Sequence, residues 1–217
     1  MCKRYFAMSP IILAASLCCA GTGYATLVNG DFSSGLDGWS VQGDVAVESG
    51  AAVLGDDAEW YSLLFQGAAL EPGAYTLQFD FFNALSGDVP DFALGPDYFV
   101  ASLYFTDDLG AFDLLNGVYD DAIGLMDMDF AGIISSSGSI APVAGMDGWY
   151  RYSIGFSNAY AYAIPVFEMM DFNFVDNDSG VGVDNVRIDP IIPEPATALL
   201  FACGLALRAA WKRRAAK

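Results

Sequence analysis

Histidine is absent from the 217 residues, and cysteine is absent from the long middle of the chain. The four cysteines lie near the two ends: Cys2, Cys18, Cys19 and Cys203. Without histidine, Ser-His and Cys-His catalysis are excluded and the commonest zinc ligand is missing. Without cysteine, the middle of the chain has neither a disulfide framework nor a thiol nucleophile.

Positive charge is also scarce. Residues 26–192 hold 26 of the 27 acidic residues but only two basic ones, Arg151 and Arg187. A segment this acidic repels phosphate backbones, so we expect no nucleic-acid binding. We do not expect disorder either, because aromatic residues make up 14% of the sequence and acidic disordered chains have few of them. The self-repulsion of the acids must be offset by salt or by bound cations.

Residues 1–25 have the pattern of a secretory signal peptide. Lys3 and Arg4 form a basic start, residues 11–20 are largely apolar, and small residues lead up to Ala25. The apolar run is shorter than the roughly 18 residues that a membrane span needs, so a permanent anchor is the weaker alternative. A lipoprotein signal is weaker still, because the pattern of small residues before a cysteine is missing. We expect signal peptidase to cleave after Ala25.

Residues 193–217 form a second segment of unusual composition. They begin with Pro193-Glu194-Pro195, which interrupts regular structure, and continue as an uncharged apolar run of residues 196–207. Basic residues then follow: Arg208, Lys212, Arg213, Arg214 and Lys217. The positive-inside rule places such an end in the cytoplasm, with the acidic part of the chain on the other side of the membrane. From length alone, the alternative is a terminal core helix.

The order of these features resembles a PEP-CTERM sorting signal, in which Pro-Glu-Pro precedes a transmembrane-like helix and a basic end. The resemblance implies a Gram-negative bacterium that makes extracellular polysaccharide. It also implies processing near Pro-Glu-Pro by the membrane enzyme exosortase. The tail would hold the protein transiently in the inner membrane, before release to the cell surface or the extracellular matrix. Arg208, within the helix, is a slight departure from the pattern.

Between these segments, residues 26–192 alternate between apolar and polar positions with a period of two, which is typical of β-strands. The expected strands cover residues 44–49, 60–66, 75–83, 98–105, 149–157 and 181–189, and turn sequences rich in Gly, Asp and Pro separate them. Residues 107–145 are expected to be loops with one or two strands. The fold class is therefore all-β, an antiparallel β-sandwich, flanked by a signal helix and a transmembrane-like helix.

Four stretches resemble the galactose-binding-like jelly rolls of carbohydrate-binding modules. They are NGDFSSGLDGW (29–39), LEPGAYTLQFDF (70–81), GWYRYSIGF (148–156) and VGVDNVRI (181–188). The resemblance implies that Phe32 and Trp39 cap the core and that the closing strand pairs near the first. It also implies sugar binding, and a structural Ca²⁺ ion near Asp31 and Asp184.

A second acidic loop, at residues 176–180, is the alternative calcium site, through Asp176 and Asp178. Carboxylate oxygens are the ligands that Ca²⁺ prefers. For both places the competing interpretation is a solvated turn, because Asp favours turns by itself.

Sugar binding normally needs exposed aromatic rings, and the candidates are Trp60, Tyr61, Tyr98, Tyr119, Tyr160 and Tyr162. The sequence does not select among them. We expect a non-enzymatic surface or matrix protein that binds extracellular polysaccharide. A secreted carbohydrate-active enzyme on the same sandwich is the alternative, although the four Glu residues of the middle segment form no recognisable motif. A matrix protein that binds no glycan is a third possibility.

Overall fold

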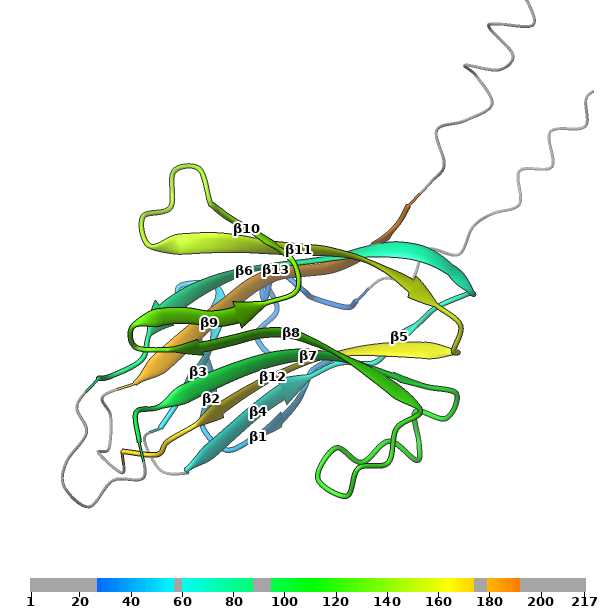
Figure 1. The fold of residues 1–217 in the computed structure, drawn as a ribbon, viewed down its shortest axis with the longest axis horizontal. Helices are drawn as coiled ribbons and strands as arrows, with labels where there is room; N and C mark the ends of the chain where they lie inside the picture. The colour runs from blue at the N-terminus through cyan, green and yellow to red at the C-terminus, as the bar shows by residue number, and fades with distance from the viewer. Residues whose placement is uncertain (1–26, 57–59, 88–94, 174–178, 192–217) are drawn as a thin grey trace, which may run out of the picture.

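The computed structural model describes residues 27–56, 60–87, 95–173 and 179–191. Within these ranges the chain forms two antiparallel β-sheets that pack face to face (Figure 1). The described part of the chain contains no helix. The expected all-β antiparallel sandwich is therefore confirmed, whereas the two helices expected at the ends of the chain lie outside the described residues.

One sheet, here called sheet B, has the strand order β10-β11-β6-β13-β3-β2. Its strands are β2 (Val45–Glu48), β3 (Ala51–Gly55), β6 (Gly73–Ala84), β10 (Ser139–Pro142), β11 (Trp149–Asn158) and β13 (Gly180–Pro190). β13 lies between β3 and β6, so the first and last parts of the domain share one sheet. This pairing confirms the expectation that the closing strand lies near the first.

The other sheet, sheet A, has the order β1-β4-β12-β7-β8-β9, and β5 also pairs with β12. Its strands are β1 (Ser40–Gln42), β4 (Tyr61–Phe65), β5 (Ala68–Ala69), β7 (Tyr98–Thr106), β8 (Asp121–Asp129), β9 (Gly132–Ser136) and β12 (Tyr162–Met170). β9 is one edge strand of sheet A and β10 is one edge strand of sheet B, and the two lie on the same side of the sandwich (Figure 1).

The core fills the layer between the sheets. Alternate residues of β6 point into it, so Leu77, Phe79 and Phe81 are buried. Phe79 stacks on Tyr152 of β11 with ring centroids 4.9 Å apart, and it meets Phe167 of β12 edge-on at 5.0 Å. These contacts join both sheets through aromatic rings, which bury large areas and prefer such offset or edge-on geometries.

The segment before β1 closes one side of the core. Phe32 and Trp39 are buried with ring centroids 5.2 Å apart, as expected for residues that cap the core. The Val186 amide of β13 donates a 2.8 Å hydrogen bond to the carbonyl of Gly30. A Cβ atom at position 30 would lie 2.0 Å from the Val186 carbonyl oxygen. Only glycine therefore allows the N-terminal turn to approach the closing strand this closely.

β12 is a strand that the periodicity did not predict. Its residues Ala163 to Phe167 are all buried, so the alternation of apolar and polar residues is missing. Phe167 faces the core, whereas Ile164 and Val166 face outward and are covered by residues 107–120. Pro165 has no N–H group to donate. It is tolerated because it lies opposite the break between β4 and β5, where the strand pairing does not require a donor.

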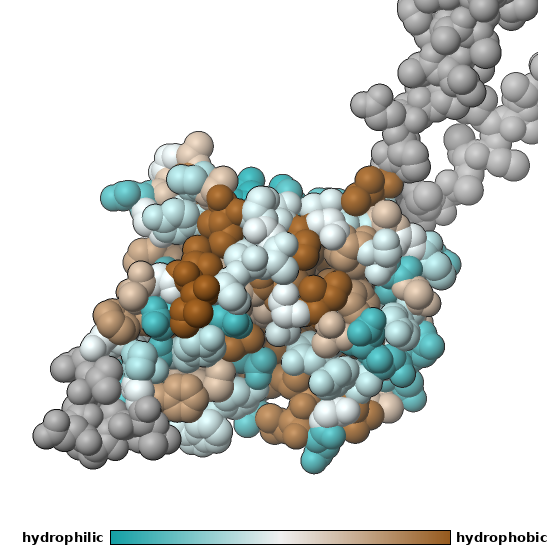
Figure 2. Space-filling view, in the orientation of Figure 1, coloured by the Kyte–Doolittle hydropathy of each residue, from teal (hydrophilic) through white to brown (hydrophobic). Residues whose placement is uncertain are grey.

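The expectation of one or two strands in residues 107–145 is wrong, because the structure forms three: β8, β9 and β10. β8 contains an irregularity in its pairing with β7 that places both Leu125 and Met126 in the core. β9 (GIISS) and β10 (SIAP) are exposed edge strands, each too short to show a clear alternation of apolar and polar residues. Ile133 and Ile134 of β9 are exposed, and Figure 2 shows hydrophobic surface on the side where β9 and β10 lie.

Candidate functional site

The segment 107–120, which joins β7 to β8, divides the outer face of sheet A. Side chains of this segment pack on a small cluster that includes Ile164 and Val166, and they bury that half of the face. The other half is more open, because Trp60 is exposed and Tyr98, Asp127 and Glu168 are half-buried, whereas Tyr61 lies beneath them as a buried member of the same cluster. We call this half the open face and define it by Trp60, Tyr61, Tyr98, Asp127 and Glu168, which β4, β7, β8, β12 and the residue before β4 supply.

Glu168 lies in the middle of the open face, between Leu63 of β4 and Val100 of β7. Its Oε1 atom accepts a 2.7 Å hydrogen bond from the Tyr61 hydroxyl. Burial raises the pKa of Glu168, and the bond from Tyr61 partly opposes this rise. Burial also raises the pKa of Tyr61, to which the bond and the charge of Glu168 add, so the phenol stays protonated and donates.

A hollow of about 220 Å³ opens beside Tyr61. Its walls are Gln42, Gly43, Trp60, Tyr61 and Leu115. Trp60 is 60% exposed, and its ring centroid lies 5.6 Å from that of Tyr61 at an angle of 40°. Leu115 comes from segment 107–120, so the segment that covers half of the outer face also forms one wall of the hollow. An exposed indole beside a phenol–carboxylate pair offers both apolar contact and hydrogen bonds.

Asp127 marks the other side of the open face. Val100 is opposite both Glu168 and Asp127, so the two acids lie in one row, two strands apart. Neighbouring strands are about 4.8 Å apart, which separates their backbones by roughly 10 Å. The Ser135 hydroxyl donates a 2.7 Å hydrogen bond to Asp127 Oδ2. The open face thus carries two spaced carboxylates with an apolar strip between them.

Of the six aromatic residues considered for sugar stacking, Trp60 is exposed on the open face and Tyr98 is half-buried there, whereas Tyr61 is buried and cannot offer its ring face to a sugar. The others lie in segment 107–120 or toward the opposite end of β12: Tyr119, Tyr160 and Tyr162. Nothing in the sequence marked Glu168 as a partner of Tyr61, because the two are 107 positions apart and meet only when β4 pairs with β12.

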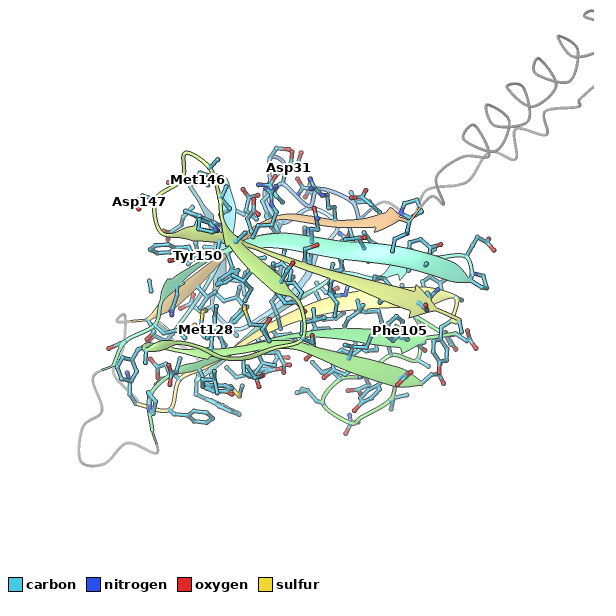
Figure 3. The ribbon with its side chains drawn as sticks, turned by 45° about the horizontal axis from the view of Figure 1, so that its top comes forward. Asp31, Phe105, Met128, Met146, Asp147 and Tyr150 are labelled. Carbon is cyan, nitrogen blue, oxygen red and sulfur yellow. The ribbon has the colours of Figure 1, made fainter. Side chains whose placement is uncertain are left out.

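Asp31 and Asp184, the expected calcium ligands, lie near each other. Asp31 is on the exposed turn before β1 (Figure 3), where its Oδ1 accepts bonds from the amide and hydroxyl of Ser33. The Asp184 carboxylate accepts bonds from the backbone and side-chain nitrogens of Asn185, at 2.6 and 2.9 Å. Burial raises the pKa of Asp184, and the charges of Asp80 and Asp31 raise it further.

These two carboxylates fit a cation only in part. Their mutual repulsion would be relieved by a positive ion, but each already accepts hydrogen bonds from its neighbours. The described residues contain no group of three or more His, Cys, Asp or Glu side chains placed to hold a metal. The alternative loop, with Asp176 and Asp178, lies outside the described residues.

The proposed sorting residues also lie outside the described residues: Pro193, Glu194, Pro195, Arg208, Lys212, Arg213 and Arg214. A search of the described part for a helix long and apolar enough to cross a membrane finds none.

Comparisons with known proteins give structural neighbours only. No protein-family model and no curated protein matches the chain. The structure is similar to the enzymatically active domain of tailspike protein 4 from bacteriophage CBA120, with a TM-score of 0.49 and 16% identity over 77% of this chain and 21% of that one. It is similar to TmCBM61, solved with β-1,4-galactotriose, with a TM-score of 0.45 and 13% identity over 76% of this chain and 98% of that one. It is also similar to the carbohydrate recognition domain of Emp47p, with a TM-score of 0.46 and 13% identity over 72% of this chain and 90% of that one.

Proposed function

We propose that this chain is an exported, non-enzymatic protein of a bacterial envelope or matrix, and that its open face binds extracellular polysaccharide. The observation that carries the proposal is the exposed Trp60 beside the Tyr61–Glu168 pair, at the rim of a hollow. Aromatic side chains with a few convergent polar groups are typical of ligand sites. The hollow, about 220 Å³, is smaller than the ~300–1,000 Å³ of enclosed pockets, which suits part of a long chain lying on a surface.

Binding of neutral polysaccharides in native gels tests this proposal. Trp60→Ala should remove the stacking surface, and Glu168→Gln should remove the carboxylate acceptor. Polysaccharide in the gel should therefore retard both variants less than it retards the wild-type protein. Tyr162→Ala is the comparison variant, because Tyr162 lies at the opposite end of β12 and lines a separate hollow of about 680 Å³, so it tests whether sugar binds there instead. Retardation that is unchanged in Trp60→Ala and Glu168→Gln would place the sugar elsewhere.

A glycoside hydrolase remains the alternative, and one feature favours it. Glu168 has a raised pKa, as a general acid requires, and Asp127 lies in the same row. Inverting enzymes hold their two carboxyl groups roughly 6.5–9.5 Å apart. We favour binding without catalysis because the four Glu residues among residues 26–192 form no recognisable catalytic motif. Release of reducing ends from a bound polysaccharide, lost in Glu168→Gln, would establish the enzyme instead.

The export part of the proposal is supported by the order of features at both ends of the sequence. β13 ends at Pro190, so the sandwich is complete before Pro193 begins the expected signal. We propose that signal peptidase cleaves after Ala25 and that exosortase processes the tail near Pro193-Glu194-Pro195. The intact mass of the protein released by its native host tests both cleavages, and retention of Lys217 in that protein would contradict the second.

We also propose that Ca²⁺ is a structural cofactor. Asp31 and Asp184 would hold it at the point where the N-terminal turn meets β13. A bound cation would neutralise two neighbouring acids in a domain that has 26 acidic residues and two basic ones. The ion would thus contribute stability and no chemistry.

A further inference from the structure

The outer face of sheet B carries an aromatic surface of its own. Trp149, the first residue of β11, lies opposite Phe82 of β6, and the two rings stack with centroids 5.9 Å apart. Gly182 of β13 lies on the other side of Phe82. A Cβ atom at position 182 would come within 3.0 Å of the Trp149 ring. The indole therefore extends across β6 and rests on the backbone of β13.

The Trp149 ring occupies the space above Gly182, and this explains why glycine occurs there. Its φ angle is outside the left-handed region, so the backbone does not require glycine. Trp149 is half-buried and Phe82 is 37% exposed. One face of the indole ring rests on the sheet, so the opposite face of the ring is the one exposed to solvent. This is a flat aromatic surface, held in place by contacts on its lower side and its edge.

Two rows of polar side chains continue from this aromatic row along the strands. In the first, Arg151 of β11 forms a two-bond ion pair with Asp80 of β6, at 2.6 and 2.7 Å. In the second, the amide of Gln78 donates to the Ser153 hydroxyl and its oxygen accepts from Arg187. Successive rows on one face of a strand are about 7 Å apart, so the three rows extend over roughly 14 Å.

The charges of this face favour an uncharged ligand. Arg151 and Arg187 are the only two basic residues among those that the structure describes. Each has an acid beside it, Asp80 at 2.6 Å and Asp189 at 3.3 Å. The side chains of this face therefore leave no positive charge over for an anionic sugar, and the remaining acids of the domain would repel one. The guanidinium groups still have N–H groups beyond those used in these bonds.

We propose that the outer face of sheet B is a second glycan-binding surface, which takes an uncharged polysaccharide chain. A sugar ring stacks on Trp149 and Phe82, and the next sugars along the chain bond to Arg151, Gln78 and Arg187. This proposal takes only the class of ligand from the proposed function. The second surface shares no residue with the open face and lies on the opposite side of the sandwich. A protein with both surfaces can join two polysaccharide chains.

Native gel electrophoresis of the full-length protein and of single-residue variants tests this surface. The gels contain mixed-linkage β-glucan, β-1,4-galactan, xyloglucan or glucomannan. Alginate and polygalacturonate are the anionic controls. Trp149→Ala should weaken binding about tenfold, as for loss of one central aromatic contact. Arg187→Ala should weaken it in the same direction, and because Arg187 is exposed this variant keeps the fold. Thermal melting of each variant checks folding.

Trp60→Ala on the open face is the matched control and separates the two proposals. With both surfaces active, each tryptophan variant loses part of the binding, and wild-type protein turns the polysaccharide solution turbid while each variant does not. If only Trp60→Ala weakens binding, the second surface is overturned and the open face stands. If only Trp149→Ala and Arg187→Ala do, the second surface stands and the open face is overturned. Failure to bind any neutral polysaccharide, or tighter binding to alginate, would overturn the second surface.

Discussion

Asp80 is a buried acid with one charged partner among the described residues. Its side chain is 1% exposed, and Arg151 contacts both of its oxygens. Arg151→Ala would leave the carboxylate buried with only the Asn185 amide as a side-chain donor. Because Arg151 itself is 39% exposed, water can partly replace it, and we expect about 1–3 kcal/mol of lost unfolding free energy in urea denaturation.

The control for this prediction is the other arginine of the same face. Arg187 and Asp189 are both largely exposed and 3.3 Å apart, so Arg187→Ala should cost less than about 1 kcal/mol. Equal small losses in the two variants would mean that Asp80 does not depend on Arg151.

Glu168 gives the domain a pH-dependent stability of known sign. Its pKa in the folded state is above the ordinary value of 4.5, mainly because of burial. The unfolded chain therefore loses this proton first as the pH rises, so the contribution of Glu168 to stability is complete below 4.5 and is lost between 4.5 and the folded-state pKa. Glu168→Gln cannot titrate. The melting temperature of Glu168→Gln minus that of the wild type should therefore increase from about pH 4 to pH 7. A constant difference would contradict the raised pKa.

Calcium should stabilise the domain through Asp31 and Asp184. An ion that binds only the folded state adds about 2.7 kcal/mol when its free concentration is 100 times its dissociation constant. At high, fixed monovalent salt, we expect millimolar Ca²⁺ to raise the melting temperature and Mg²⁺ to raise it less, because Mg²⁺ keeps its water. Asp184→Ala should remove most of the increment and Asp31→Ala part of it. A response that is equal in both variants and the wild type would place the ion elsewhere, with Asp176 and Asp178 next to test.

At the scale of elements, segment 107–120 is an extension of the core. Phe112 contacts Phe65 and Tyr104, with ring centroids 5.6 and 6.0 Å apart, on the outer side of sheet A. Phe112→Ala should cost about 1–2 kcal/mol, since this ring is only partly buried. We expect protease to cut the variant first within 107–120 while both sheets stay protected. Cleavage spread over the whole chain would mean that the segment is needed for the fold.

The strands that could be predicted are those with one covered face. β6, β7 and β11 alternate because one side meets the core and the other meets solvent, and the predicted ranges agree with the structure to within a few residues. β12 was missed because segment 107–120 covers its outer side and makes its middle apolar throughout. β9 and β10 could not be placed within the expected loop region because they are exposed edge strands of only five and four residues, too short to show an alternating pattern.

The candidate sites were predictable only in part, for a similar reason. The family resemblance placed Asp31 near Asp184, and the structure brings them close enough for one charge to raise the pKa of the other. The open face could not be found in advance. Which tyrosines stay uncovered is decided by where segment 107–120 folds back, and a local sequence pattern does not contain that information.

At the scale of the whole molecule, the sandwich should fold without the terminal segments. The buried core is formed by residues between Phe32 and Ile188, and β13 is complete at Pro190. A shortened chain of residues 26–192 should give a β-type circular dichroism spectrum and melt in one cooperative step. If this chain is unfolded while the full-length chain is folded, the segment 193–217 is part of the core and the sorting proposal fails.

The place of β13 in sheet B sets the order in which the molecule can be made. Of the strands that the structure describes, this one is synthesised last, yet it separates β3 from β6 and pairs with both. Before it arrives, β3 and β6 each have an edge without a partner, and the chain must close a loop of more than a hundred residues to complete the sheet. Such long-range pairing is slow. Sheet B therefore cannot be completed during synthesis until β13 has been made, so the last step of folding waits for the last strand that the structure describes.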